Sequence, residues 1–118
     1  MKSDADLFFE AVRGNNINKV IELVKQGVDV NSVDKNNYNK TALHVAAEMG
    51  YKDILELLIK DRANINIQDD FGDVPLHVAV DNDHRELAKI LIENNSDYID
   101  HVREILGVNE DGSIKLDF

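Results

Sequence analysis

Apolar and polar positions follow the same order twice in the middle of the chain. The segment TALHVAAEMG at residues 41–50 is echoed 33 residues later by VPLHVAVDND at residues 74–83. Each copy is followed by a second apolar run, DILELLIK from residue 53 and its counterpart over residues 87–92. A fixed period of this length indicates a repeated supersecondary unit.

Each unit predicts a short helix, a longer helix and a connecting turn. Thr41 can cap the short helix, Gly50 offers the left-handed backbone that ends it, and Pro75 suits the first turn of the later copy. The apolar stripe of the longer helix is too wide for a helix covered on one side only. We therefore expect similar units to stack and hide each other's apolar faces. The polar segments VNSVDKNNYNK and INIQDDFGD are expected to project as hairpin turns, and KNNYNK, in a turn two residues longer than its successor, is expected to protrude.

These motifs resemble those of the ankyrin repeat family. The two Leu-His words, the leucine-rich second helices and the ending GVDVN at residues 27–31 are similar to the family's pattern. The resemblance covers about residues 4–99. It implies an all-α, ankyrin-type solenoid of about three helix-turn-helix repeats. Five positions where the pattern carries glycine hold other residues, namely Asn15, Asn39, Arg62, Asp83 and Asn95.

The whole chain, residues 1–118, is interpreted as a single domain. Residues 4–35 form an N-terminal capping repeat, because Lys19 and Glu22 stand where the next copy has Ile54 and Leu57. Residues 36–69 and 70–99 are the second and third repeats. The apolar spacing in DYIDHVREILG predicts a capping helix over residues 97–107, and residues 108–118 are a tail or a short hairpin.

Composition and charge narrow the classes of function. The net charge is −10, and residues 70–118 carry twelve acidic against four basic side chains. Such a field repels phosphate backbones, so no nucleic-acid partner is expected, and it either steers a basic protein or serves solubility alone. The chain has no cysteine, its first residues lack the uninterrupted apolar stretch of a signal peptide, and no segment has the apolar length of a membrane span. It is predicted to be a cytoplasmic monomer that contacts no membrane.

Catalytic, cofactor and metal sites are not predicted. The resemblance implies that His44 and His77 are structural residues that bond a helix cap and the neighbouring turn. The DFG at residues 70–72 lacks the other kinase motifs. Residues 107–118 partly match a calcium loop, but Gly107 and Phe118 stand at its first and last positions, where carboxylates are needed. A cluster of Asp70, Asp81 and Asp83 shows no nucleophile beside it, so the chain is predicted not to be an enzyme.

The resemblance implies protein binding through turn tips and the exposed face of the short helices. Carried over residue by residue, the binding positions are Arg13, Lys35, Asn36, Asn37, Tyr38, Lys40, Glu48, Met49, Asp70, Phe71, Asp73, Asp81 and Asn82. Tyr38, Met49 and Phe71 are the expected apolar anchors, beside an acidic flank. Alternatively, both rings fold back onto their own turns. The competing function is a small acidic inhibitor or immunity-type protein that blocks a basic toxin or nuclease.

Overall fold

The computed structural model describes residues 1–95, 107, 109–110 and 115. Within them six α-helices form three consecutive pairs. The pairs are α1 (Asp4–Arg13) with α2 (Ile17–Lys25), α3 (Ala42–Met49) with α4 (Lys52–Lys60), and α5 (Pro75–Asp81) with α6 (Arg85–Glu93). The predicted all-α solenoid of three helix pairs is confirmed.

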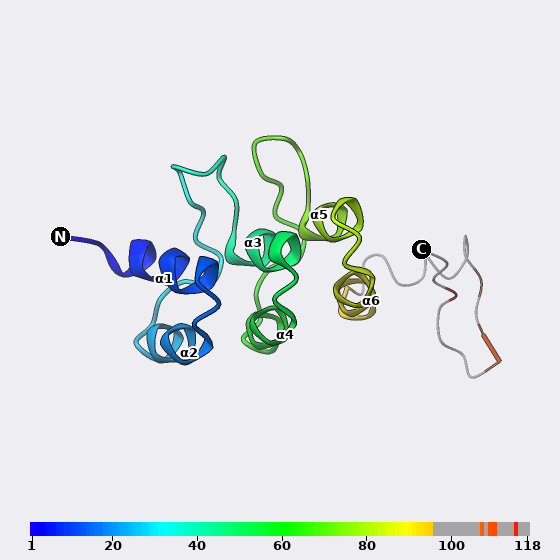
Figure 1. Cartoon of the computed structure of the whole chain (residues 1–118), viewed down its shortest axis with the longest axis horizontal. Coiled ribbons are helices and arrows are strands. Elements are labelled where there is room, and N and C mark those ends of the chain that lie inside the picture. Colours follow the sequence, from blue (N-terminus) through cyan, green and yellow to red (C-terminus); the bar gives the residue numbers. More distant parts are fainter. Residues whose placement is uncertain (96–106, 108, 111–114, 116–118) are drawn as a thin grey trace.

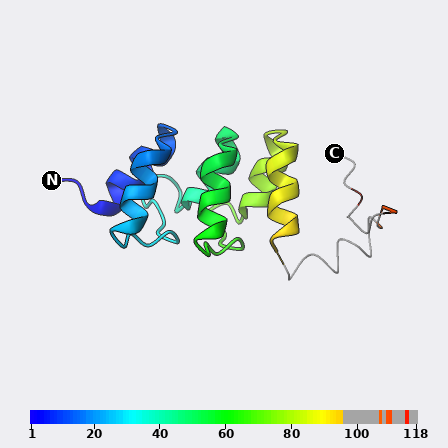
Figure 2. The same cartoon turned by 90° about the horizontal axis from the view of Figure 1, so that it is seen from below.

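The pairs stack side by side in two rows of helices (Figure 1). Helices α1, α3 and α5 contact one another in one row, and α2, α4 and α6 form the other. The segments that lead into α3 and α5 project beyond the first row, as predicted (Figure 1). Seen from below, the second row lies as parallel cylinders along the stack (Figure 2). Each pair contacts the pairs next to it, so the repeats form a linear array.

The short helices α3 and α5 begin and end at residues suited to helix ends. Thr41 caps α3 and Pro75 occupies the first turn of α5, as the sequence predicts. Gly50 ends α3 with a φ of 77°, in the left-handed region. Of the residues that replace family glycines, four also have positive φ, namely Asn15, Asn39, Arg62 and Asp83. The fifth, Asn95, is buried, and its side-chain amide donates to the Asn66 side chain at 2.8 Å.

The apolar core runs without interruption through all three pairs. Ile54, Leu55 and Leu58 of the middle pair are fully buried, because α4 is covered by helices on both sides. Burying a side chain of this size contributes about 2 kcal/mol to stability. On the first pair, Lys19 and Glu22 remain partly exposed and form an ion pair at 3.4 Å.

The predicted capping helix over residues 97–107 and the tail or hairpin over residues 108–118 lie outside the described residues, apart from a few isolated positions. Both stay predictions.

Candidate functional site

The turn between α2 and α3 is a narrow hairpin. The Asp34 N–H donates to the Lys40 carbonyl at 2.9 Å, and the Lys40 N–H donates to the Asn37 carbonyl at 3.1 Å. Tyr38 and Asn39, the two residues at its tip, both have a φ of 56°, as a type I′ turn requires. Asn tolerates this conformation, but a bulky aromatic rarely adopts it. The turn therefore holds Tyr38 in an unusual backbone position.

The turn between α4 and α5 is organised by a buried carboxylate. Asp69 is 7% exposed, and its Oδ1 accepts hydrogen bonds from the N–H groups of Phe71 at 2.9 Å and Asp73 at 3.0 Å. Gly72 supplies the positive φ that closes the turn. Because one side chain satisfies two backbone donors, this turn keeps a defined shape.

The two turns are joined to each other at their tips. The Asp70 N–H donates to the Tyr38 carbonyl at 2.9 Å, and the Asn39 side-chain amide donates to Asp70 Oδ1 at 2.8 Å. The Tyr38 and Phe71 rings pack at a centroid distance of 4.8 Å and an interplanar angle of 46°. Both side chains nevertheless stay exposed, at 57% and 63%. The rings thus form an aromatic pair across the turns instead of folding onto their own turns.

Charged side chains connect the turn between α2 and α3 to the short helices α1 and α3. Lys40 Nζ lies 3.6 Å from Glu48 Oε2 on α3 and 6.0 Å from the Tyr38 ring centroid. Arg13 of α1 reaches Asp34 at 3.0 Å. Each ion pair links this one turn to a different helix. Lys40 and Arg13, both predicted as binding positions, are engaged in ion pairs within the chain.

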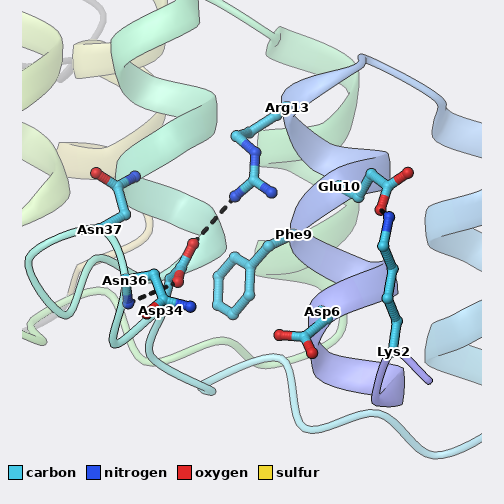
Figure 3. A pocket seen from close by; sticks show the side chains of 8 residues that line it. All are labelled: Lys2, Asp6, Phe9, Glu10, Arg13, Asp34, Asn36 and Asn37. Carbon is cyan, nitrogen blue, oxygen red and sulfur yellow. Dashed lines mark hydrogen bonds and ion pairs between the residues drawn. The ribbon is translucent and has the colours of Figure 1, made fainter.

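A hollow of about 590 Å³ lies between α1 and the first turn (Figure 3). Its lining is mostly polar and includes Arg13, Asn36 and Asn37 from the predicted set. Lys2 pairs with Glu10 on its rim, and the hydrogen bond and charge of Lys2 hold the pKa of Glu10 below its usual value. Figure 3 shows Phe9 pointing from α1 into the space below Arg13.

A second hollow, of about 410 Å³, lies at the third repeat. The described residues that line it are Asp73, Leu76, His77, Val80, Asp81 and Ile92. Of these, sequence reasoning identified only Asp73 and Asp81 as binding residues. The apolar wall was missed because Leu76 and Val80 fit equally well as core positions of a short helix.

The two Leu-His histidines have different roles. The ring of His44 is fully buried; its Nε2–H donates to the Asp73 carbonyl at 2.7 Å, and its Nδ1 accepts from the Thr41 N–H at 3.1 Å. Desolvation by burial lowers its pKa. The structural role predicted for His44 is confirmed. The same prediction for His77 is wrong, because its side chain is 59% exposed and lies 3.7 Å from the Asp73 carboxylate.

The remaining predicted residues are distributed along the rim. Lys35 and Met49 are exposed, and Met49 retains half of its surface in solvent. The Asn82 side-chain amide donates to the Val78 carbonyl of its own helix at 2.8 Å, so this amide serves as a cap. Asn39, absent from the predicted set, links the turns through Asp70. Only the expected positive φ of Asn39 gave a sequence signal for its importance.

Over the described residues, no group of three His, Cys, Asp or Glu side chains is placed to hold a metal ion. In the same part of the chain, every helix is too short or too polar to cross a membrane.

A family model and several curated proteins match parts of this chain. A family model described as ankyrin repeats, in three copies, matches residues 7–102. The chain is 41% identical over 59 residues to a serine/threonine-protein kinase 12 of Arabidopsis thaliana, and the match covers 50% of this chain and 12% of that protein. It is 39% identical over 66 residues to protein phosphatase 1 regulatory subunit 27 of Mus musculus, covering 56% and 42%.

A third relative is an ankyrin repeat-containing protein of Caenorhabditis elegans, 38% identical over 66 residues, with 53% of this chain and 6% of that protein covered. The chain therefore spans less than half the length of each of these curated relatives.

Proposed function

The chain belongs to the ankyrin repeat family, and on that premise we propose that it is a non-enzymatic module that binds another protein through its turn tips and concave face. Ankyrin repeats generally mediate contacts between proteins, and one relative bears the name of a phosphatase regulatory subunit. The partner surface we propose comprises the turn tips and the exposed ends of α3 and α5. The protein is expected to act as a monomer, which light scattering will check.

The observation that carries this proposal is the exposed aromatic pair. Tyr38 and Phe71 leave more than half of their surface in water, although burying an aromatic ring is worth about 2 kcal/mol. Two turns hold the rings in place through the hydrogen bonds of Asp70. A partner that covers the rings gains this burial without ordering a loose loop, and such preorganisation raises affinity.

The test combines capture with substitution. Affinity capture from the native extract, read by mass spectrometry, identifies the partner, and the double variant Tyr38→Ala with Phe71→Ala is then titrated against it. We expect affinity to fall at least tenfold, since aromatic anchors typically contribute about 2 kcal/mol each. The melting temperature should stay close to that of the parent chain, because neither ring is core.

The control variant is Glu56→Ala with Lys60→Ala, two exposed positions on α4 in the other row of helices. It should bind like the parent chain. Undiminished binding by the aromatic double variant would contradict the proposal.

A second candidate function, an acidic inhibitor of a basic toxin or nuclease, is favoured by the charge of residues 70–118. The two candidates differ in salt dependence. Binding driven by charge collapses as ionic strength rises, because the Debye length falls from about 10 Å at 0.1 M to about 3 Å at 1 M. Binding anchored by the aromatic pair persists. A titration of the captured partner over this range of salt therefore separates them.

A further inference from the structure

The two turns that project from the stack in Figure 1 carry a narrow apolar patch at their tips. Within the described residues, the exposed large apolar side chains are Met1, Val33, Tyr38, Met49, Phe71 and Val80. Tyr38 and Phe71 pair across the turns, with ring centroids 4.8 Å apart, and the other four lie outside the turn tips. The neighbours of both rings in the sequence are asparagine, aspartate and glycine. The patch is therefore two rings wide and has a polar border.

The width of this patch determines which kind of segment fits it. An amphipathic helix presents apolar anchors at i, i+3, i+4 and i+7, which extend over about 10 Å at about 1.5 Å per residue. The two ring centroids are only 4.8 Å apart, so most of these anchors would lie on the polar border. A polyproline II segment rises by about 3.1 Å per residue, and two or three of its residues therefore span the ring pair. An extended segment matches the patch, and a helix does not.

The rings are held in position by the turns themselves. Tyr38 has a φ of 56°, which a bulky aromatic rarely adopts, and its carbonyl accepts from the Asp70 N–H at 2.9 Å. Backbone strain of this kind persists only where the surrounding structure imposes it, and it concentrates at ligand-binding sites. A small rigid patch binds a flexible segment weakly, because ordering that segment costs conformational entropy. A proline-rich segment loses less entropy, since its φ angles are already fixed.

The tip of the first turn also offers hydrogen-bond donors. Within the described residues, the Tyr38 phenol and the side-chain amides of Asn36 and Asn37 have no hydrogen-bond partner in the chain. A polyproline II segment has no internal hydrogen bonds, and its prolines have carbonyl oxygens but no N–H. Such a segment therefore requires donors from its receptor, and the phenol and the amides supply them.

We propose that the aromatic pair binds a proline-rich segment of the partner protein in the polyproline II conformation. The pyrrolidine rings of the segment pack against Tyr38 and Phe71, and the Tyr38 phenol donates a hydrogen bond to one of its carbonyl oxygens. Aromatic-lined surfaces generally recognise proline-rich segments through this chemistry. This inference rests on the proposed function and specifies the chemistry of the partner. A helical or folded epitope is the alternative outcome of the test.

The experiment uses the full chain labelled with ¹⁵N and two peptide probes, acetyl-Ser-Leu-Pro-Pro-Leu-Pro-Pro-Ser-amide and acetyl-Ser-Leu-Ala-Ala-Leu-Ala-Ala-Ser-amide. Both peptides carry the same leucines, and only the first carries pyrrolidine rings. The proline peptide should shift the amide signals of residues 36–39 and 70–72 in a saturable manner, whereas the alanine peptide should not. Binding of the proline peptide should persist at high salt, because none of its contacts is charged.

Three variants test the assigned contacts. Tyr38→Ala and Phe71→Ala should each lower the affinity of the proline peptide about tenfold, as expected when an aromatic anchor is lost. Tyr38→Phe keeps the ring and removes only the phenol, so it should lower the affinity by roughly two- to tenfold, the effect of one hydrogen bond. The matched control Val33→Ala truncates an exposed apolar residue that precedes the turn tip and should leave binding unchanged. Thermal melts establish that each variant folds.

Several results would overturn the proposal: no saturable shift with the proline peptide, shifts that map elsewhere, equal binding of both peptides, or equal effects of Phe71→Ala and Val33→Ala. The captured natural partner supplies a separate readout, because overlapping peptides of its sequence locate the segment that binds. If the partner requires Tyr38 and Phe71 but its binding segment has no proline, this inference fails while the proposed binding function stands. If the partner binds the double alanine variant as tightly as the parent chain, the proposed function itself fails.

Discussion

Removal of the buried imidazole of His44 tests how the repeats are joined. The ring satisfies the Thr41 cap of its own helix and the Asp73 carbonyl of the next turn. His44→Ala leaves these groups without partners, at about 1–3 kcal/mol for each buried group, and also opens a cavity. We expect a total loss of about 3–5 kcal/mol, which lowers the melting temperature by roughly 10–25 °C in a domain of this size.

A second histidine of the chain serves as the control. His77 occupies the equivalent position of the third repeat, yet its side chain is 59% exposed. His77→Ala should change the free energy of unfolding by no more than about 0.5 kcal/mol, as is usual at exposed positions. His44→Gln keeps a nitrogen donor of similar reach and should recover part of the loss. The measurement is urea and thermal unfolding followed by helical circular dichroism.

The result that would refute this reasoning is an equal loss in the two alanine variants. An equal loss would mean that the Leu-His word stabilises each helix locally, and that the hydrogen bond from His44 to the next turn adds nothing. A loss below about 1 kcal/mol at His44 would show that water replaces the imidazole at both sites.

Two further predictions concern the same joints. Burial lowers the pKa of His44. Below about pH 6.5 the unfolded chain therefore binds a proton that the folded chain does not. The contribution of His44 to the free energy of unfolding should be constant above this pH and fall below it by at most about 1.4 kcal/mol per pH unit. Urea unfolding at several pH values measures this, and an identical slope in His44→Gln would contradict it. Gly50→Ala places a Cβ 2.8 Å from the His84 ring at a φ of 77°, whereas Gly72→Ala at 78° meets nothing within 4 Å. We expect about 1 kcal/mol of strain at Gly72 and about 2–3 kcal/mol at Gly50; equal losses in thermal unfolding would show that His84 moves aside freely.

The helical framework could be predicted from sequence because it depends on features that each repeat carries within itself. The Leu-His words fix where the short helices begin, and the wide apolar stripes require neighbours on both sides. Even the left-handed positions were predictable, because Asn15, Arg62 and Asp83 stand in the register of glycines and have positive φ. These properties depend on residues within one repeat, and their recurrence in successive repeats makes them recognisable in the sequence.

The details of the candidate site depend on contacts between repeats, which no local pattern records. Sequence reasoning treated His44 and His77 alike because their neighbours in sequence are alike. What distinguishes them is the turn that follows in space: Asp73 offers a carbonyl to His44, while the described residues place no such turn against His77. The contact between Tyr38 and Phe71 likewise joins residues 33 positions apart, and it depends on the stacking of the repeats and on the hydrogen bonds between their turns.

Buried and rim positions of this stack are constrained differently, so the rim carries the information about binding. A stack of equivalent repeats constrains the buried positions to remain alike, since each must fit the next unit. Rim positions carry no such constraint, so a change of charge there needs another cause. The replacement of a Lys and Glu pair by Asp73 and Asp81 gives up one attraction and adds one repulsion without changing the framework. A basic partner of the kind proposed above would relieve that repulsion, so this part of the rim is where its positive charge is expected.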